Sequence, residues 1–410
     1  MTGPTVRLID VTTRLGSGIT PRGGAAAYKT SGRPFVRSQN VGWGELRLAD
    51  LAYIDDATHG TFASTEVREG DVLLNITGAS IGRCAVATAE LDGGNVNQHV
   101  CEIRLKPGVM DPYFVNAVLL SRIGQDQIAA FQAGGNRQGL NFQQVGSIRI
   151  PDISIEQQRM IGAALRDADH SVAALERLIV KKRAIKKGLV QQLLTGVAHL
   201  PGYADDMWKE WRLSELLRRP PRYGINAAAS PLTSGFPTYI RITDIDDSGK
   251  FSPRPKVGVK HPRSSDYKLG DGELVFARTG ASVGKSYLYD PRDGELVYAG
   301  FLINIAPDPQ RLNPKYFSLF AQTKEYWNWV ARTSVRSGQP GINGREYAQL
   351  TFSAPGIETQ SAIADVVSGI DDEIDALGRC LSKAQLVRLG MMQELLGGRV
   401  CLPVQGEGSE

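Results

Sequence analysis

The pattern of apolar and polar residues is most regular in residues 154–196, where apolar side chains recur at steps of three and four. This spacing places them on one face of a helix and is typical of a coiled-coil seam. Ser154 with Gln157 indicates the start of the helix, and Thr195-Gly196 indicates its end. The predicted seam consists of Ile161, Leu165, Ala168, Val172, Leu175 and Ile179.

The same seam returns 202 positions further along the chain. Polar residues repeat at this offset too, among them Gln158 with Gln360 and Asp169 with Asp371. Two unrelated amphipathic helices would not share one fixed offset over so many positions, so a duplication is the better interpretation. We therefore predict a second long helix that packs against the first, with a seam formed by Ile363, Val367, Ile370, Ile374, Leu377 and Leu381.

The segments that precede the two helices also match each other. Residues 70–87, GDVLLNITGASIGRCAVA, and residues 270–288, GDGELVFARTGASVGKSYL, both predict a strand, a glycine-rich turn and a second strand. In the first copy, HVCEIRL (99–105) alternates like a strand, with Glu102 on one face. A helix is predicted to begin at Pro112 and to continue through PYFVNAVLLSRIGQDQIAAF.

This repeated order predicts an α+β fold with a pseudo-two-fold internal repeat. Two tandem mixed α/β domains are separated by two long helices, and the helices form an antiparallel coiled coil. The framework of the two domains agrees, but their loops differ, which suggests two different binding surfaces. The predicted boundaries are 1–150 for the first domain, 151–198 for the first helix, 199–353 for a linker and the second domain, 354–400 for the second helix, and 401–410 for a flexible tail.

Composition narrows the class of protein. The chain has 410 residues, long enough for two or more domains, and 42% of them are apolar, as in soluble globular proteins. No apolar run is long enough to cross a membrane and the N-terminus has no signal-peptide pattern, so we expect a cytoplasmic protein. The four cysteines form no CxxC motif, which speaks against a metal site. A net charge of +4 permits a polyanionic partner without requiring one.

The sequence contains no convincing catalytic motif. TGASVGKS (279–286) resembles a phosphate-binding loop, but only three residues separate its two glycines instead of four, and TGASIGRC (77–84) lacks the lysine. DPYF (111–114) and NPKY (313–316) lack the second proline of a methyltransferase motif, and neither half has a GxGxxG. A tight turn between strands explains the TGAS segments better, either as a plain hairpin or as a backbone that approaches a ligand.

Polar loop residues of the types that contact phosphates and base edges gather in both domains. The alternative interpretation of each one is an ordinary solvated loop residue that does not contact DNA. The basic run 176–187 is either a solvated helix face or a surface for DNA or a partner subunit. The candidates in the first domain are Arg37, Ser38, Gln39, Asn40, Thr77, Ser80, Arg83, Asn136, Arg137, Gln138 and Asn141. Those in the second are Arg241, Thr243, Arg278, Thr279, Ser282, Lys285, Arg336, Gln339 and Asn343.

With these motifs the chain resembles the specificity (S) subunit of type I restriction–modification enzymes. The resemblance rests on IPDISIEQQRMIGAAL and LVQQLLTG with their second copies, on the paired TGAS segments and on NQHVCEIRL, and it covers nearly the whole chain. It implies that each domain is a target recognition domain for one half of a bipartite site in double-stranded DNA. It also implies that the long helices set the spacing and carry two methyltransferase (M) subunits.

The resemblance further implies a subunit without catalytic activity and without a cofactor of its own. S-adenosylmethionine would be bound by the M subunits, which methylate adenine, and ATP and magnesium by restriction (R) subunits, where these are present. Two other hypotheses remain open at this point. One is a coiled-coil adaptor that assembles proteins without sequence-specific DNA binding, and the other is an ATPase or nuclease that uses residues 279–286.

Overall fold

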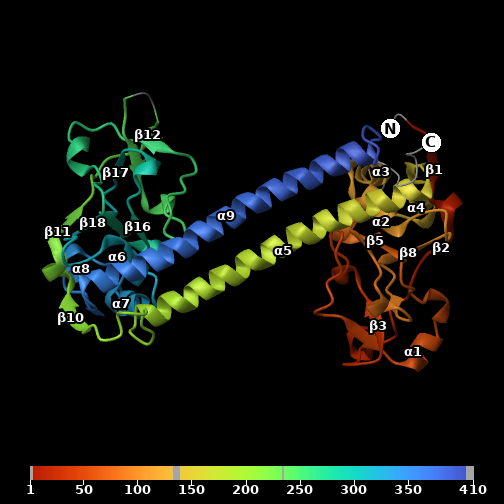
Figure 1. Ribbon diagram of the computed structural model, residues 1–410, viewed down its shortest axis with the longest axis horizontal. Helices are drawn as coiled ribbons and strands as arrows, with labels where there is room; N and C mark the ends of the chain where they lie inside the picture. Colours follow the sequence, from red (N-terminus) through yellow and green to blue (C-terminus); the bar gives the residue numbers. More distant parts are fainter. Residues whose placement is uncertain (1–2, 133–138, 233–234, 403–410) are drawn as a thin grey trace. The chain divides into compact units, whose positions relative to one another are not determined.

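The computed structural model describes residues 3–132, 139–232 and 235–402. The chain divides into two compact units, of which unit 1 comprises Met1–Arg177 with Gly378–Glu410, and unit 2 comprises Leu178–Leu377. Each unit combines one mixed α/β domain with part of both long helices (Figure 1). The mixed helix-and-sheet class predicted from the sequence is confirmed.

The described residues of unit 1 form three small sheets. The central one has the strand order β2-β8-β5-β6 and is antiparallel throughout, the second has the order β4-β3-β7, and β1 pairs with β9. Only the pairing of β3 with β7 is parallel among these strands. The strands are β1 (Thr5–Arg7), β2 (Thr12–Ser17), β3 (Arg33–Val36), β4 (Ala52–Ile54), β5 (Val72–Asn75), β6 (Cys84–Val86), β7 (Asn95–Val96), β8 (Val100–Leu105) and β9 (Arg149–Pro151).

The helical segment that begins at Pro112 is not one helix, and the prediction of a continuous helix was wrong. Ser121 adopts an extended conformation, with ψ 171°, and its hydroxyl donates to the carbonyl oxygen of Val118. Gly124 then approaches Leu119 so closely that a Cβ would lie 2.5 Å from the Leu119 Cα. The short helices of unit 1 are α1 (Asp56–Gly60), α2 (Pro112–Leu120), α3 (Arg122–Gln132) and α4 (Phe142–Ser147).

Unit 2 repeats this plan. Its central sheet has the order β11-β18-β15-β16, a second sheet has the order β12-β14-β13-β17, and β10 pairs with β19. The strands are β10 (Lys209–Arg212), β11 (Leu217–Tyr223), β12 (Ser230–Pro231), β13 (Thr238–Ile240), β14 (Val257–Gly258), β15 (Leu274–Ala277), β16 (Ser286–Leu288), β17 (Leu296–Tyr298), β18 (Leu302–Pro307) and β19 (Thr351–Ala354). The short helices are α6 (Pro314–Phe320), α7 (Lys324–Thr333) and α8 (Gly344–Ala348).

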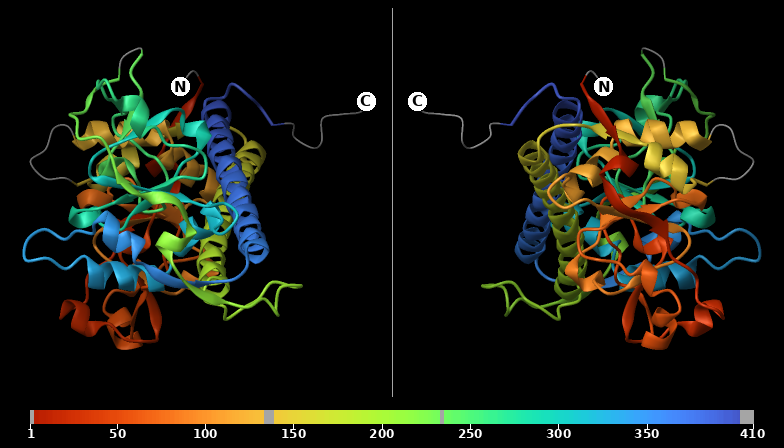
Figure 2. Two further views of the ribbon diagram at one scale, coloured as in Figure 1. Left: turned by 90° about the vertical axis from the view of Figure 1, so that its left-hand side faces the viewer. Right: turned by 90° about the vertical axis from the view of Figure 1, so that its right-hand side faces the viewer.

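The two long helices are α5 (Ile155–Leu193) and α9 (Ile357–Leu396), and they run side by side within each unit (Figures 1 and 2). In unit 1, Asp169 pairs with Arg388 and Glu176 lies beside Gln385, so the helices are antiparallel. In unit 2, Lys186 pairs with Asp371 at 2.6 Å. The pair in unit 2 is the pair in unit 1 displaced by 202 positions, with Lys186 in the place of Arg388 and Asp371 in the place of Asp169. All the predicted seam residues are buried or half-buried.

The ends of the long helices also complete the domain cores. In unit 1, Met392, Leu395 and Leu396 of α9 join a core that includes Ile161 and Leu165 of α5. The corresponding core of unit 2 contains Val190 and Leu193 of α5 and the following Leu194, together with Ile363 and Val367 of α9. Each domain therefore buries the start of one helix and the end of the other, which accounts for a unit boundary that falls inside both helices.

A buried glutamine joins each long helix to its domain. Gln158, 1% exposed, accepts a hydrogen bond from the Asp111 amide at 2.9 Å and donates to the Ile153 carbonyl at 2.8 Å. Gln360, also 1% exposed, accepts from the Asn313 amide at 2.9 Å and donates to the Pro355 carbonyl at 2.9 Å. A buried amide side chain is stable only when its polar atoms are paired, so this geometry fixes the start of each helix.

We predict that Gln158→Leu destabilises the chain by about 2–4 kcal/mol, because two main-chain groups lose their partner in a buried place. The free energy of unfolding of the full chain, measured in urea, checks this. Gln360→Leu is expected to have a similar effect. Arg159→Leu, one position later and exposed, serves as the control and is expected to change the stability by less than about 0.5 kcal/mol. If the control lost as much stability as Gln158→Leu, Gln158 would not be the residue that fixes the start of the helix to the domain.

Candidate nucleic-acid interface

The glycine-rich TGAS segments form tight turns between antiparallel strands. The turn of unit 1 joins β5 to β6, with Gly78 at φ 71°, and the turn of unit 2 joins β15 to β16, with Gly280 at φ 75°. A positive φ favours glycine, which explains the residue at both places. A phosphate-binding loop of the P-loop type leads from a strand into a helix, whereas these turns lead into a second strand. The geometry therefore speaks against the ATPase hypothesis.

The turns bring together segments that are far apart in the sequence. Thr77 forms a β-bridge with Gly139, and Thr279 forms the same bridge with Gly341. In unit 1 the side-chain amide of Asn75 donates to the Ser38 carbonyl at 2.8 Å, so the 3-10 turn at residues 38–40 lies beside the end of β5. Most candidate residues of the first domain therefore gather at one end of its sheets. Asn136, Arg137 and Gln138 lie outside the described residues.

The gathered residues of unit 1 differ in how much of the side chain can meet a ligand. Gln39 and Asn141 are exposed, although Asn141 also accepts a hydrogen bond from the Gln144 amide at the start of α4. Asn40 is 1% exposed and donates to the Arg47 carbonyl, so it serves the fold. The Arg37 guanidinium lies over the Tyr28 ring at 5.3 Å. The remaining candidates, which are half-buried, are Ser38, Thr77, Ser80 and Arg83.

In unit 2 several of the predicted cations are already paired. Arg241 pairs with the buried Asp244 at 2.7 Å, and Lys285 with Asp247 at 2.6 Å. Arg336 pairs with Glu346 at 2.6 Å. Such side chains can still meet a phosphate, but only by exchanging one partner for another. The other candidates are Thr243, Gln339 and Asn343, which are exposed, and Arg278, Thr279 and Ser282, which are half-buried.

The sequence analysis missed residues that lie directly beside the two turns. In unit 1, His99 contacts Thr77 at 2.6 Å and Gln98 at 3.0 Å. In unit 2 the position 202 residues after His99 is Phe301, whose side chain is 57% exposed. The repeat itself was the signal that could have found them, because it aligns a histidine with a phenylalanine at the edge of a shared turn.

Comparisons with known proteins agree with this arrangement. No protein-family model matches the chain. Over 383 residues it is 20% identical to a protein of Methanocaldococcus jannaschii that is named as the specificity subunit of the type I restriction enzyme MjaX, covering 90% of this chain and 87% of the relative.

Two solved structures match over nearly their full length. The S subunit of a type I restriction–modification system from M. genitalium has a TM-score of 0.61 at 14% identity, with 96% of this chain and 95% of that chain covered. A chain from a structure of the type I restriction–modification system has a TM-score of 0.57 at 17% identity, with 98% and 99% covered. The chain has the fold of the type I specificity subunits. The resemblance stated from the sequence is confirmed.

The basic run 176–187 has a mixed role in this fold. Lys182 and Lys186 pair with Glu373 and Asp371 of α9, so they stabilise the coiled coil. Other basic residues of the run, Lys181, Arg183 and Lys187, are exposed. Together with Arg177, which is exposed as well, these residues are the part of the run that is available to DNA or to a partner.

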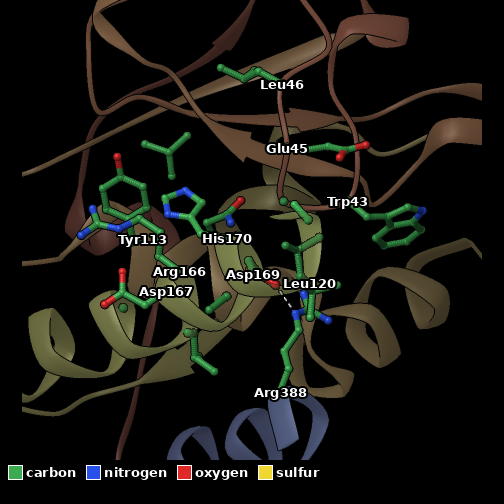
Figure 3. A pocket seen from close by; sticks show the side chains of 18 of the residues that line it. Trp43, Glu45, Leu46, Tyr113, Leu120, Arg166, Asp167, Asp169, His170 and Arg388 are labelled. Atoms are coloured by element: carbon green, nitrogen blue, oxygen red, sulfur yellow. Dashed lines mark hydrogen bonds and ion pairs between the residues drawn. The ribbon is translucent and has the colours of Figure 1, made fainter. Parts of the chain in front are cut away.

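A cavity of about 1000 Å³ opens in unit 1 beside the long helices (Figure 3). The loop with Trp43 and Leu46 lies on one side, and Arg166, His170 and Arg388 of the helices lie on the other. The Arg166 guanidinium rests on the Tyr113 ring at 4.5 Å. The lining mixes apolar side chains, such as Leu165 and Met392, with charged ones, such as Glu176 and Arg177.

The central sheet of unit 1 carries a cluster of ionisable side chains, of which Glu102 and Asp71 are buried. Glu102 is fully buried and pairs with Arg14 at 2.9 Å and Arg104 at 2.8 Å, and Arg104 also binds Asp71 at 2.7 Å. Burial and the neighbouring Asp71 carboxylate raise the pKa of Glu102 to about 7. The alternation in the sequence did not reveal this, because both faces of β8 are covered. In unit 2 the equivalent position holds Asn304, which carries no charge and donates to Glu273 at 3.1 Å.

Two further searches concern the described part of the chain alone. Within residues 3–132, 139–232 and 235–402, no helix is long and apolar enough to cross a membrane. The same residues contain no group of three or more histidine, cysteine, aspartate or glutamate side chains placed to hold a metal ion.

We predict that Glu102 makes the stability fall by about 1–3 kcal/mol as the pH rises from about 4.5 to about 7. The native carboxyl keeps its proton in this window, whereas the unfolded carboxyl has lost it, so a higher pH favours the unfolded chain. Glu102→Gln has no proton to lose, and its stability should be flatter over this range. Unfolding of the full chain from pH 4.5 to 8 measures the difference, with the exposed Glu69→Gln as control. A parallel fall in wild type and Glu102→Gln would contradict the assignment.

Proposed function

We propose that this chain is the DNA specificity subunit of a type I restriction–modification complex. Each domain recognises one half of an asymmetric bipartite site in double-stranded DNA. The observation that carries this proposal is the repeat: two domains share one framework and one glycine-rich turn, yet they present different side chains around that turn. The similarity to a relative named as a specificity subunit supports it.

The residues around each turn supply the two kinds of contact that sequence-specific binding needs. The half-buried basic residue after each turn, Arg83 or Lys285, is suited to phosphate. Exposed amides such as Gln39 and Gln339 are suited to base edges in the major groove, where each good pair contributes about 1–3 kcal/mol of discrimination. Phosphate contacts hold the register, and the base contacts select the sequence.

In this proposal the coiled coil sets the distance between the two half-sites and carries the M subunits. Exposed apolar side chains on α9 of unit 1 support a docked partner: Leu386 is 69% exposed, Val387 52% and Leu389 50%. Apolar side chains in such a group are typical of a protein-binding surface. The M subunits supply adenine methylation with S-adenosylmethionine, and R subunits, where present, use ATP and magnesium.

We predict that the chain assembled with its M subunits binds one bipartite DNA sequence, and that binding weakens steeply with salt, because phosphate contacts release counterions. Mapping of methylated adenines gives the site, and fluorescence anisotropy with a duplex of that site gives the affinity. Replacing residues 1–150 with the first domain of another S subunit should change one half-site and leave the other unchanged. An assembled complex without sequence preference would leave the coiled-coil adaptor as the function.

We also predict that Leu386→Ser with Leu389→Ser weakens the binding of the M subunit about tenfold or more, because two exposed apolar contacts are lost. Titration of the labelled chain with its M subunit measures this. Val109→Ser replaces an exposed apolar residue of the turn before α2 and is the matched control. Equal affinity of the double variant and the wild type would place the docking surface elsewhere.

A further inference from the structure

Two residues precede the central strands β8 and β18 in the same place of each repeat. They are Gln98-His99 in unit 1 and Gly300-Phe301 in unit 2. The backbone is held in the same way, because the Ile76 amide donates to the His99 carbonyl at 3.0 Å and the Arg278 amide donates to the Phe301 carbonyl at 3.0 Å. Each pair therefore lies beside its TGAS turn with the same backbone pairing, and only the side chains differ.

In unit 1 the side chains form a directed hydrogen-bond chain. The Thr20 hydroxyl donates to Gln98 Oε1, and Gln98 Nε2 donates to His99 Nε2 at 3.0 Å. With Nε2 as the acceptor from Gln98, His99 Nδ1 is the atom that donates to Thr77 Oγ1, at 2.6 Å. The chain fixes the orientation of the exposed Gln98 amide. One N–H and one oxygen lone pair of that amide remain beyond these bonds.

In unit 2 the same place offers no amide, because position 300 is glycine. It presents the Phe301 ring instead, which is 57% exposed. The guanidinium of Arg278, the residue whose backbone amide binds the Phe301 carbonyl, rests on the Tyr223 ring at 4.9 Å, and the Tyr223 hydroxyl accepts from the Gly344 amide at 3.1 Å. Covering such an exposed apolar ring with a partner is favourable, because apolar surface is then removed from water.

We propose that this pair of positions contacts a base in each half-site and makes the two half-sites different. Gln98 presents one donor and one acceptor, the pattern that matches N7 and the N6 amino group of adenine. Phe301 packs against the C5 methyl group of a thymine. Thr20 and His99 are positioning residues that fix the amide of Gln98. The inference rests on the proposed function, since it needs DNA bound at the turns.

Modified bases test each contact separately in the assembled complex of this chain with its M subunits. Each thymine of the second half-site is replaced in turn by deoxyuridine, which lacks only the C5 methyl group. Wild type should lose affinity about three- to fivefold at one position, the worth of one buried methyl group. Phe301→Ala should bind both duplexes equally, and Phe301→Leu should retain part of the difference.

The same logic applies to the first half-site, where each adenine is replaced by 7-deazaadenine, which lacks the N7 acceptor. The affinity of wild type should fall about five- to 100-fold at one position, and the affinity of Gln98→Ala should not change with the substitution at that position. His99→Ala should discriminate less than wild type between adenine and 7-deazaadenine. In combination with Gln98→Ala it should cause no further loss of discrimination. This non-additivity distinguishes a positioning residue from a second contact.

The controls separate this inference from the proposed function. Phe301→Ala should leave the first half-site unchanged, and Gln98→Ala should leave the second unchanged. His261→Ala, in unit 2, should alter neither.

If wild type binds its site but the effect of every base substitution is the same in wild type and in the variants at residues 98 and 301, the inference fails and the function stands. If Phe301→Ala weakens M-subunit binding instead, the ring belongs to a protein contact and the inference is overturned. If wild type shows no sequence preference at all, the proposed function itself fails.

Discussion

The amide side chains of Gln158 and Gln360 are the joints on which the rest of the structure depends. Each lies buried where a long helix leaves its domain, and each binds the main chain of the segment before the short helix, at Asp111 or Asn313. A long helix that only touched its domain through apolar contacts could rotate or slide against it. Two hydrogen bonds from one buried side chain fix both the direction and the rotation of the helix against its domain.

The ion pairs between α5 and α9 extend the same symmetry along the helices. Asp169 with Arg388 and Asp371 with Lys186 occupy equivalent places, so each unit holds one copy of the contact. The two copies are not identical, since a guanidinium offers a planar fork and an ammonium a single point of charge. The domains diverge more strongly, and they do so around the turns, where Gly300 and Phe301 replace Gln98 and His99. The framework is thus kept, while the side chains around the turns vary.

The repeat and the long helices were visible in the sequence because they rest on periodicity, which is a local signal. The break at Ser121 was not, because it depends on the close approach of Gly124 to Leu119. The burial of Glu102 was missed for a similar reason: alternation predicts one covered face, and only the packing of the domain shows that both faces are covered. Candidate loop residues could be named by type, but the sequence could not tell exposed Gln39 from buried Asn40, whose side chain accepts from the Arg37 amide and so caps its own turn. Their contacts with DNA remain predictions.

The glutamine joints have a consequence for how such a protein can diversify. Gln158 binds main-chain atoms of Asp111 and Ile153, and every amino acid except proline offers the same donor, while all offer the same acceptor. The joint therefore places almost no demand on the side chains of the domain that it holds. Mutation can therefore change the side chains around the joint while its hydrogen bonds survive, so the surface of a domain can vary in evolution without a change in the helix that holds it.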